Sequence, residues 1–473
     1  MENAFSLISM SFVQNIIYPI MPVSIQNLMI SGFGYQWYRR RFGGAFKSFL
    51  EEVKARELFA HEQWSDYQTE MLRKILVHAY RNVPFYREKY TNSGILQSDL
   101  QNIKLSELKH LPYLEKDDLR RFGTSLLLSE KRSKGIFISS SGSTGTPTKI
   151  YLPIYFHQKW TAVMEARVRN WAGVNKDTPR GMIGGRRIIK GASASAPYYR
   201  YNFFERQTYL SAYHISSNSV DNYLEGIIDN RVEYLTGYAM SIYLLSRFIA
   251  ERGLTAPKLT AVITSSEKLT HEMRRTIEEV FQCRVFDSYS GCEACGLISE
   301  TPEGIMVVSP DAGIMEFIDF EGNYVNPGET GEIVSTGLIN YDQPLIRYRI
   351  GDLARVSKDQ SPVNGRHMLR IDEIEGRIED TVTTPDGRVM VRFHSVFVDI
   401  PGLKSGQVIQ HSYTKFTIKL IIEKGVYNKE ISENTLKNRL ISQIGIVDVI
   451  FDYPDRLIHS SSGKVKAVIS ELH

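Results

Sequence analysis

Apolar residues recur at helical spacing between residues 45 and 93, which predicts helices there. Two groups of residues have this spacing: Phe46, Phe49, Leu50 and Val53, then Met71, Leu72, Ile75, Leu76 and Ala79. Asn82-Val83-Pro84 ends the second group, because a proline disfavours helical geometry in the residue before it. We therefore expect the first 95 residues to form a helical segment.

From about residue 134 to residue 350, short apolar runs alternate with helical patterns. The clearest unit is a strand over 259–264, a helix over 269–280 and a strand over 284–287. This order predicts a mostly parallel sheet with crossover helices, in which ligands bind at the carboxyl ends of the strands. Ser265-Ser266-Glu267 and Ser288-Tyr289-Ser290 follow two of these strands and are candidate ligand loops.

After residue 310 the pattern changes to strands joined by turns of glycine, asparagine and proline, for example at 321–323, 326–329 and 385–387. A boundary near 377–380 begins a smaller unit with alternating strands, one helix over 432–444 and a final strand. A chain of 473 residues is too long for one core. We expect an α/β protein with a large N-terminal domain, residues 1–378, and a small α+β C-terminal domain, residues 379–473.

Charge and cysteine content narrow the class of protein. The net charge of +4 is too small to indicate a nucleic-acid-binding surface. Three cysteines cannot form a disulfide framework and favour a reducing compartment, with the cytoplasm as the default. We predict no signal peptide and no membrane span, because the N-terminal apolar residues are interrupted by Asn15, Pro19 and Pro22. Two alternatives stay open for this segment: it packs on the protein, or it rests on a membrane surface.

A loop rich in hydroxyls and glycines lies between two strand-like runs, over residues 139–149. Glycine lets successive N–H groups approach an anion, and Ser and Thr hydroxyls donate to its oxygens, so the loop predicts a phosphate site. A proline and a strand follow it, which excludes a P-loop, and a flexible surface loop is the alternative. The candidate phosphate ligands are Ser141, Gly142, Ser143, Thr144, Gly145, Thr146 and Lys149.

Five segments, in order, resemble the motifs of the AMP-forming acyl-CoA synthetase and ligase superfamily, whose members form adenylates: 139–149, 289–293, 345–352, 376–380 and 461–464. Residues 82–86 and the Arg-Tyr-Arg sequence before Asp352 resemble its phenylacetate-CoA ligase branch. Within that branch the chain is similar to CapK-like members, which are associated with capsule or surface-polysaccharide synthesis. The resemblance covers most of the chain and implies a large adenylation domain and a small mobile lid.

The resemblance also implies ATP and Mg²⁺ as cofactors and a nucleotide site at the strand ends. Tyr289 would stack on adenine, Asp352 would accept hydrogen bonds from both ribose hydroxyls, and Glu293 would bind magnesium. Each role has a structural alternative: a core tyrosine, a turn-capping aspartate and a solvated glutamate. The other residues implied at adenine and ribose are Ser266, Glu267, Asp287, Ser288 and Arg377.

Lys464 is the catalytic residue that the resemblance implies. Negative charge grows on the phosphoryl oxygens when a carboxylate attacks the α-phosphorus of ATP, and a cation placed there stabilises the transition state. The lid is expected to rotate about a hinge at Glu379 and Asp380 between the two half-reactions. Glu379 stands where the family usually has an aspartate.

The predicted acid pocket is polar and basic rather than apolar. These residues favour a small polar or anionic acid that arginine would bind, and the alternative is a solvated basic loop. The candidates are Arg186, Arg187, His214, Gly237 and Tyr238. Cys292 and Cys295 have metal-ligand spacing, but no further cysteine pair or histidine is near, so zinc is not expected.

These features predict an ATP-dependent ligase that forms an acyl-adenylate from a small-molecule carboxylic acid. The acyl group would then pass to an amine, for which the CapK-like resemblance argues, or to the thiol of CoA, which the wider branch implies. Two other readings are a nucleotidyltransferase that leaves AMP on a small molecule and an inactive nucleotide-binding scaffold. The sequence leaves the acid, the acceptor and the oligomeric state open.

Overall fold

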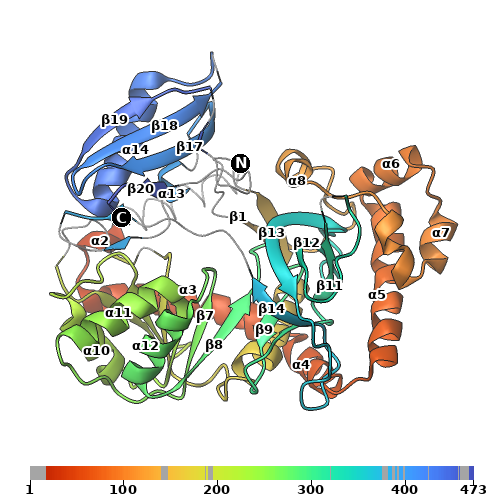
Figure 1. Ribbon diagram of the computed structural model, residues 1–473, viewed down its shortest axis with the longest axis horizontal. Coiled ribbons are helices and arrows are strands. Elements are labelled where there is room, and N and C mark those ends of the chain that lie inside the picture. Colours follow the sequence, from red (N-terminus) through yellow and green to blue (C-terminus); the bar gives the residue numbers. More distant parts are fainter. Residues whose placement is uncertain are drawn as a thin grey trace.

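The computed structural model describes residues 17–139, 148–186, 188–189, 195–319, 321–374, 382–385, 389–390, 394–397, 400–423, 425–455, 457–458 and 468–472. In this part of the chain, a 12-stranded sheet runs in the order β11-β12-β13-β14-β10-β9-β8-β7-β6-β3-β5-β4. Figure 1 shows the C-terminal strands as a separate layer above it.

The predicted N-terminal helices are confirmed. They are α4 (Phe46–Ala55), α5 (His61–Asn82) and α6 (Pro84–Asn92), and α6 begins at the proline that was expected to end the preceding helix. Shorter helices follow: α7 (Gln97–Asn102), the 3-10 helix η2 (Leu105–His110) and α8 (Lys116–Phe122). Before them lie α2 (Tyr18–Ile20) and a long helix, α3 (Val23–Phe42), which is within the helical segment expected over residues 1–95 although no apolar periodicity marked it.

The parallel half of the large sheet also agrees with the prediction. Its strands are β3 (Arg180–Gly184), β5 (Gln207–Ser211), β6 (Tyr234–Tyr238), β7 (Ala261–Ser265) and β8 (Arg284–Tyr289). The helices α10 (Val220–Asp229), α11 (Ala239–Glu251) and α12 (His271–Phe281) pack beside these strands (Figure 1). The Thr270 side chain accepts a hydrogen bond from Met273 N and so caps α12.

The expectation of a mostly parallel sheet needs a correction for the other half, which is antiparallel. Short turns join most of its strands and leave no room for a crossover helix. The strands are β9 (Ile298–Glu300), β10 (Met306–Val308), β11 (Gly313–Ile318), β12 (Thr330–Gly337), β13 (Tyr348–Val356) and β14 (Arg370–Ile374). Edge strand β4 (Tyr199–Asn202) is also antiparallel to its neighbour.

The predicted phosphate loop is framed by a hairpin. β1 (Gly135–Ser139) pairs with β2 (Lys149–Pro153), and Ser139 lies directly opposite Lys149. The helix α9 (Ile154–Met164) and the π-helix η3 (Glu165–Arg169) follow. The backbone that enters and leaves the loop is therefore held at a fixed separation.

The C-terminal strands form a four-stranded sheet with its own core. Helix α14 (Lys429–Ile444) packs on it and is capped by Asn428, whose side chain accepts from Ile431 N. The predicted boundary at 378/379 lies outside the described residues and stays a prediction. The remaining elements are β15 (Val382–Thr383), β16 (Val389–Met390), α13 (His394–Phe397), β17 (Leu403–Gln410), β18 (Lys415–Ile422), β19 (Asp448–Asp452) and β20 (Val468–Ser470).

Among the helices that the structure describes, none combines the length and the apolar character needed to cross a membrane.

Candidate nucleotide and acid site

The carboxyl ends of β6, β7 and β8 bring several predicted residues to one edge of the sheet. Tyr238 lies opposite Ser265, and Ser265 lies opposite Ser288 in the next strand. Ser266 follows directly, with a positive φ of 73° that turns the chain sharply out of the sheet. The two loops predicted from the strand pattern are therefore neighbours.

Glu267 also supports a helix. Its Oε2 accepts a hydrogen bond of 2.9 Å from Met240 N, in the first turn of α11, where backbone N–H groups lack partners within the helix. The contact ties the loop after β7 to the helix after β6. A structural role thus accompanies the nucleotide-binding role predicted for Glu267.

Asp287 is buried at the end of β8. Burial raises the pKa of its carboxyl to about 6. Two hydrogen bonds favour the charged form and therefore act in the opposite direction, but their effect is smaller. These come from Thr264 Oγ1 at 2.8 Å and Ser288 N at 3.0 Å, and they orient the carboxyl along the strand end. The nearby carboxylate of Glu300 adds to the upward shift.

Tyr289 and Asp352 come from different motifs and meet. The Tyr289 hydroxyl donates a hydrogen bond of 2.9 Å to Asp352 Oδ2. Burial, and then the Asp352 carboxylate, raise the pKa of Tyr289 well above its usual value, so the phenol stays a donor.

Glu293 lies beside the same pair of segments. Its Oε1 accepts from the Tyr348 hydroxyl at 3.2 Å, and its Oε2 lies 3.5 Å from Cys292 Sγ. The side chain folds over Gly291, where an added Cβ would be 2.4 Å from Glu293 Oε2. Hard carboxylate oxygens with free acceptor positions suit magnesium, so Glu293 fits the predicted metal role.

The two cysteines near Glu293 are held as thiols. Burial raises the pKa of Cys295 to about 12 and that of Cys292 well above its usual value, and the Glu293 carboxylate adds to both shifts. Within the described residues, no group of three or more His, Cys, Asp and Glu side chains is arranged to hold a metal. All three cysteines are free.

The hairpin that frames the phosphate loop is anchored by an amide that sequence reasoning missed. Gln343 is fully buried; its Oε1 accepts from Tyr151 N at 2.7 Å, and its Nε2 donates to Gly123 O at 2.7 Å and Lys149 O at 3.2 Å. Asn340 Nδ2 also donates to Tyr151 O, at 2.9 Å. The signal in the sequence was the polar run after an apolar strand, Asn340-Tyr341-Asp342-Gln343.

The candidates for the acid pocket lie at the ends of β3, β5 and β6. His214 is buried, shares a 2.7 Å hydrogen bond with Ser211 Oγ and stacks on Tyr198 at 4.9 Å between ring centroids. An added Cβ at Gly185 would be 2.4 Å from the Tyr238 hydroxyl, and one at Gly237 would be 1.8 Å from Ile183 O. Gly237, at φ 147°, is therefore required by packing as well as by backbone geometry.

Arg186 has a partner of its own in this region. Its Nη1 donates to the Tyr209 hydroxyl at 2.8 Å, and its guanidinium lies over the rings of Tyr209 and Phe33. It therefore contacts α3 as well as the β5 strand. The role in acid binding stays a prediction.

Several predicted residues lie outside the described part of the chain, and their roles stay predictions. They are Lys464, the phosphate ligands Ser141, Gly142, Ser143, Thr144, Gly145 and Thr146, and Arg187, Arg377, Glu379 and Asp380. Lys149 is described and exposed.

Comparison with known proteins finds similar sequences over most of the chain. Residues 382–471 match the family model of the CapK C-terminal domain. Protein CapK of Staphylococcus aureus is 25% identical over 97% of this chain and 99% of its own length. The phenylacetate-coenzyme A ligase of Pseudomonas putida is 27% identical over 66% of this chain and 70% of its own length. These relatives confirm the predicted resemblance to the CapK-like and phenylacetate-CoA ligase-like proteins and the predicted enzyme class, an AMP-forming ligase.

Solved structures support the same fold. A structure of 2-hydroxyisobutyryl-CoA ligase in complex with its acyl-adenylate, 2-HIB-AMP, and CoA has a TM-score of 0.56. The alignment covers 88% of this chain and 92% of that chain at 18% identity. An open conformation of the same ligase gives a TM-score of 0.53. The large α/β body with a separate C-terminal unit is therefore the fold of adenylate-forming ligases.

Proposed function

We propose that this protein uses ATP to activate a small carboxylic acid as an acyl-adenylate, and then transfers the acyl group to an amine. The observation that supports the proposal best is the hydrogen bond between Tyr289 and Asp352, from two separate motifs. It puts an aromatic face and a carboxylate side by side, as adenine stacking and ribose binding require.

In this proposal, the residues at the strand ends bind and orient the nucleotide. Magnesium, held by Glu293, would neutralise phosphate charge, and the 139–149 loop would donate hydrogen bonds to the phosphates. Lys464 would then stabilise the charge that develops on the α-phosphate as the carboxylate attacks and pyrophosphate leaves. Rotation about Glu379 and Asp380 would bring the lid to the site and exclude water.

The acid is proposed to be small and polar. Buried His214 and exposed Arg186 lie at the strand ends next to Gly237, and a long apolar chain there would remove the Arg186 guanidinium from water, which costs free energy. CoA is the alternative acceptor, because the related 2-hydroxyisobutyryl-CoA ligase structure contains it. A reducing compartment, the cytoplasm, is part of the proposal, since all three cysteines are free thiols.

The first experiment measures acid-dependent exchange of pyrophosphate into ATP across a panel of amino acids, sugar acids and aryl acids, with Mg²⁺. We expect exchange with at least one small polar acid and loss of exchange by orders of magnitude in Lys464→Ala, because the cation acts in the adenylation transition state. Lys466→Ala is the matched control and should keep exchange. An exchange rate in Lys464→Ala equal to that of the wild type would contradict the role of Lys464.

The second experiment identifies the acceptor. With the active acid, mass spectrometry follows reactions that contain either CoA or a mixture of amino sugars and other amines. An amide product supports the amine acceptor, whereas an acyl-CoA product without amide returns the protein to the CoA ligases. Stable transfer of AMP to the small molecule, without acyl transfer, would instead favour the nucleotidyltransferase reading.

A further inference from the structure

Part of the inner side of α3 is polar because it covers an open edge of the large sheet, while Ile30 and Phe42 pack against buried apolar clusters. β4 is the edge strand, and its outward N–H groups need partners. Tyr201 N donates to Asn27 Oδ1 at 3.0 Å and Phe203 N donates to Ser31 Oγ at 3.1 Å, so α3 supplies acceptors one turn apart. The buried residues of α3 are Gln26, Ser31 and Gly34.

The outer side of α3 carries apolar side chains instead. Ile25, Leu28 and Tyr35 share this side by helical spacing, and Leu28 is 69% exposed. The turn after β4 extends the surface, since the Phe204 ring lies 4.8 Å from Tyr35 and Phe203 is 62% exposed. We call Ile25, Leu28, Tyr35, Phe203 and Phe204 the α3 patch. A group of exposed apolar side chains on one helix and the adjoining turn indicates an apolar partner there.

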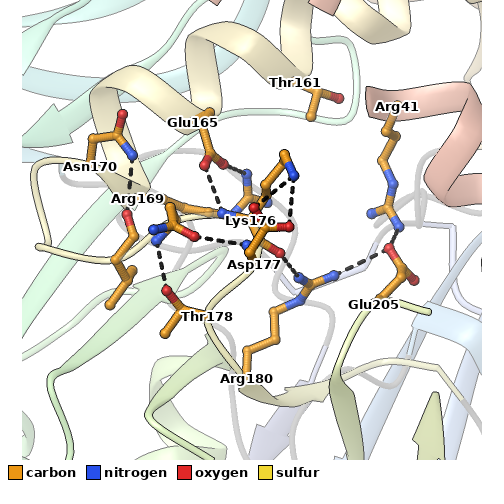
Figure 2. A network of polar contacts seen from close by, with 12 residues as sticks. Arg41, Thr161, Glu165, Arg169, Asn170, Lys176, Asp177, Thr178, Arg180 and Glu205 are labelled. Atoms are coloured by element: carbon orange, nitrogen blue, oxygen red, sulfur yellow. Dashed lines mark hydrogen bonds and ion pairs between the residues drawn. The ribbon is translucent and has the colours of Figure 1, made fainter. Parts of the chain in front are cut away.

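Fixed contacts hold the α3 patch in place. Arg41, at the C-terminal end of α3, and Arg180, on β3, both contact the Glu205 carboxylate, which lies in the same turn as Phe203 and Phe204 (Figure 2). Glu205 is buried, so its charge is neutralised inside the protein. The helix and the aromatic turn are therefore joined into one rigid surface.

The exposed charges beside the α3 patch are positive. Residues 17–50 contain no aspartate or glutamate, and Arg39 is exposed on the same side of α3, with its guanidinium over the Tyr35 ring. Arg206 is exposed in the aromatic turn. The carboxylate of Asp177, whose backbone oxygen Arg206 contacts, is paired with Lys176 at 2.7 Å.

We propose that the α3 patch docks on the surface of an anionic lipid bilayer. Aliphatic and aromatic side chains flanked by arginine match the boundary between acyl chains and negative headgroups. A second copy of the chain would bring Arg39 and Arg206 near identical charges, which a bilayer does not. The protein would thus work at a membrane surface without crossing it.

The test is cosedimentation of the full-length protein with vesicles of phosphatidylglycerol and phosphatidylcholine, or of phosphatidylcholine alone. We expect binding to the anionic vesicles and a reduction of about tenfold or more in Leu28→Gln/Phe203→Ser. The matched control is Leu58→Gln/Leu96→Gln, which changes equally exposed residues, at 64% and 61%, elsewhere. Arg39→Gln should reduce binding about fivefold at low salt, and Arg275→Gln should not.

Thermal unfolding of each variant checks that the fold is intact. Failure of the wild-type protein to bind anionic vesicles would overturn the proposal, as would equal binding by the patch variant and its control. Light scattering that shows a wild-type dimer and a monomeric Leu28→Gln/Phe203→Ser variant would assign the patch to a second copy of the chain instead. None of these outcomes depends on whether the acid or the acceptor has been found.

Discussion

Arg347 and Asp352 lie close together in one motif, yet their surroundings differ. Arg347 is buried, and its guanidinium makes two 3.0 Å hydrogen bonds to Glu316 and two of 2.6 Å to the backbone oxygens of Lys109 and Leu111. Asp352, in the middle of β13, accepts a hydrogen bond of 2.9 Å from the hydroxyl of Tyr289, a residue of another motif. The arginine is fixed by contacts within the fold, whereas the aspartate is the residue predicted to bind ribose.

A single motif can thus contain one residue that stabilises the fold and another that is predicted to bind the ligand. Arg347 also has a positive φ of 48°, an unfavourable geometry that its bonds hold in place. The segment it anchors leads directly into β13, which carries Asp352 to the site. We therefore expect changes at Arg347 to affect the stability of the fold, and changes at Asp352 to affect the binding of nucleotide.

The largest expected effect is the loss of stability in Arg347→Met. This variant leaves the Glu316 carboxylate buried without its cationic partner, which should lower the free energy of unfolding by about 3–5 kcal/mol. Urea unfolding measures it. Arg349→Met is the control: Arg349 pairs with Glu332 at the surface, so the change should be about 0–1 kcal/mol. Equal losses of stability in the two variants would contradict the special structural role of Arg347.

A second prediction tests the burial of Asp287. Its pKa of about 6 in the folded protein lies above the ordinary 3.8, so the folded state keeps the proton longer and stability falls as pH rises from about 4 to about 6. The charged form is thus destabilising at neutral pH by about 3 kcal/mol. Asp287→Asn keeps the acceptor for Thr264 and removes the charge, so this part of the pH dependence should vanish.

The measurement is urea unfolding of the wild-type protein and Asp287→Asn at pH 4 and pH 7. The wild-type protein should lose more stability between the two pH values than the variant does. Asp372→Asn, at an exposed position, is the matched control. A pH dependence that is the same in the wild-type protein and in Asp287→Asn would show that Asp287 titrates normally.

The sequence predicted those helices and strands whose own residues show a clear apolar pattern. Helices α5 and α6 follow from apolar spacing and from Pro84, and the order of β7, α12 and β8 follows from alternating runs. Helix α3 lies within the helical segment expected over residues 1–95, but apolar spacing did not mark it, because its apolar residues lie on several sides: Ile30 and Phe42 pack inward, whereas Leu28 is exposed. The polar residues Asn27 and Ser31 of α3 are explained only by their hydrogen bonds to edge strand β4 and the turn after it, which lie far away in the sequence.

Local sequence patterns also predicted only part of the candidate site. Tyr289, Glu293 and Asp352 stand in recognisable motifs, and the fold brings their segments together. Gln343 was missed because its hydrogen bonds join the backbone of distant residues, Gly123 and Tyr151. Such contacts depend on tertiary packing, which the sequence pattern around a single residue does not encode.

The third prediction concerns the binding of ATP by Asp352. Asp352→Ala should weaken ATP binding by about 1.5–3 kcal/mol, because the ribose hydroxyls lose a charged acceptor. Titration calorimetry gives the affinity, and Asp359→Ala, at an exposed turn, is the control. Unfolding by urea should change less than in Arg347→Met. An ATP affinity equal to that of the wild type would exclude Asp352 from the site.

The smallest expected effect separates the ring of Tyr289 from its hydroxyl. Tyr289→Phe keeps the aromatic face and removes the 2.9 Å hydrogen bond that orients Asp352, so ATP affinity should fall by about 0.5–1.5 kcal/mol. Tyr289→Ala also removes the stacking surface and should cost about 1–3 kcal/mol more, the usual range for a base on an aromatic ring. Calorimetry of both variants with ATP and with pyrophosphate provides the contrast, since pyrophosphate has no base to stack. If Tyr289→Phe and Tyr289→Ala lose the same affinity for ATP, Tyr289 acts through Asp352 alone and adenine lies elsewhere.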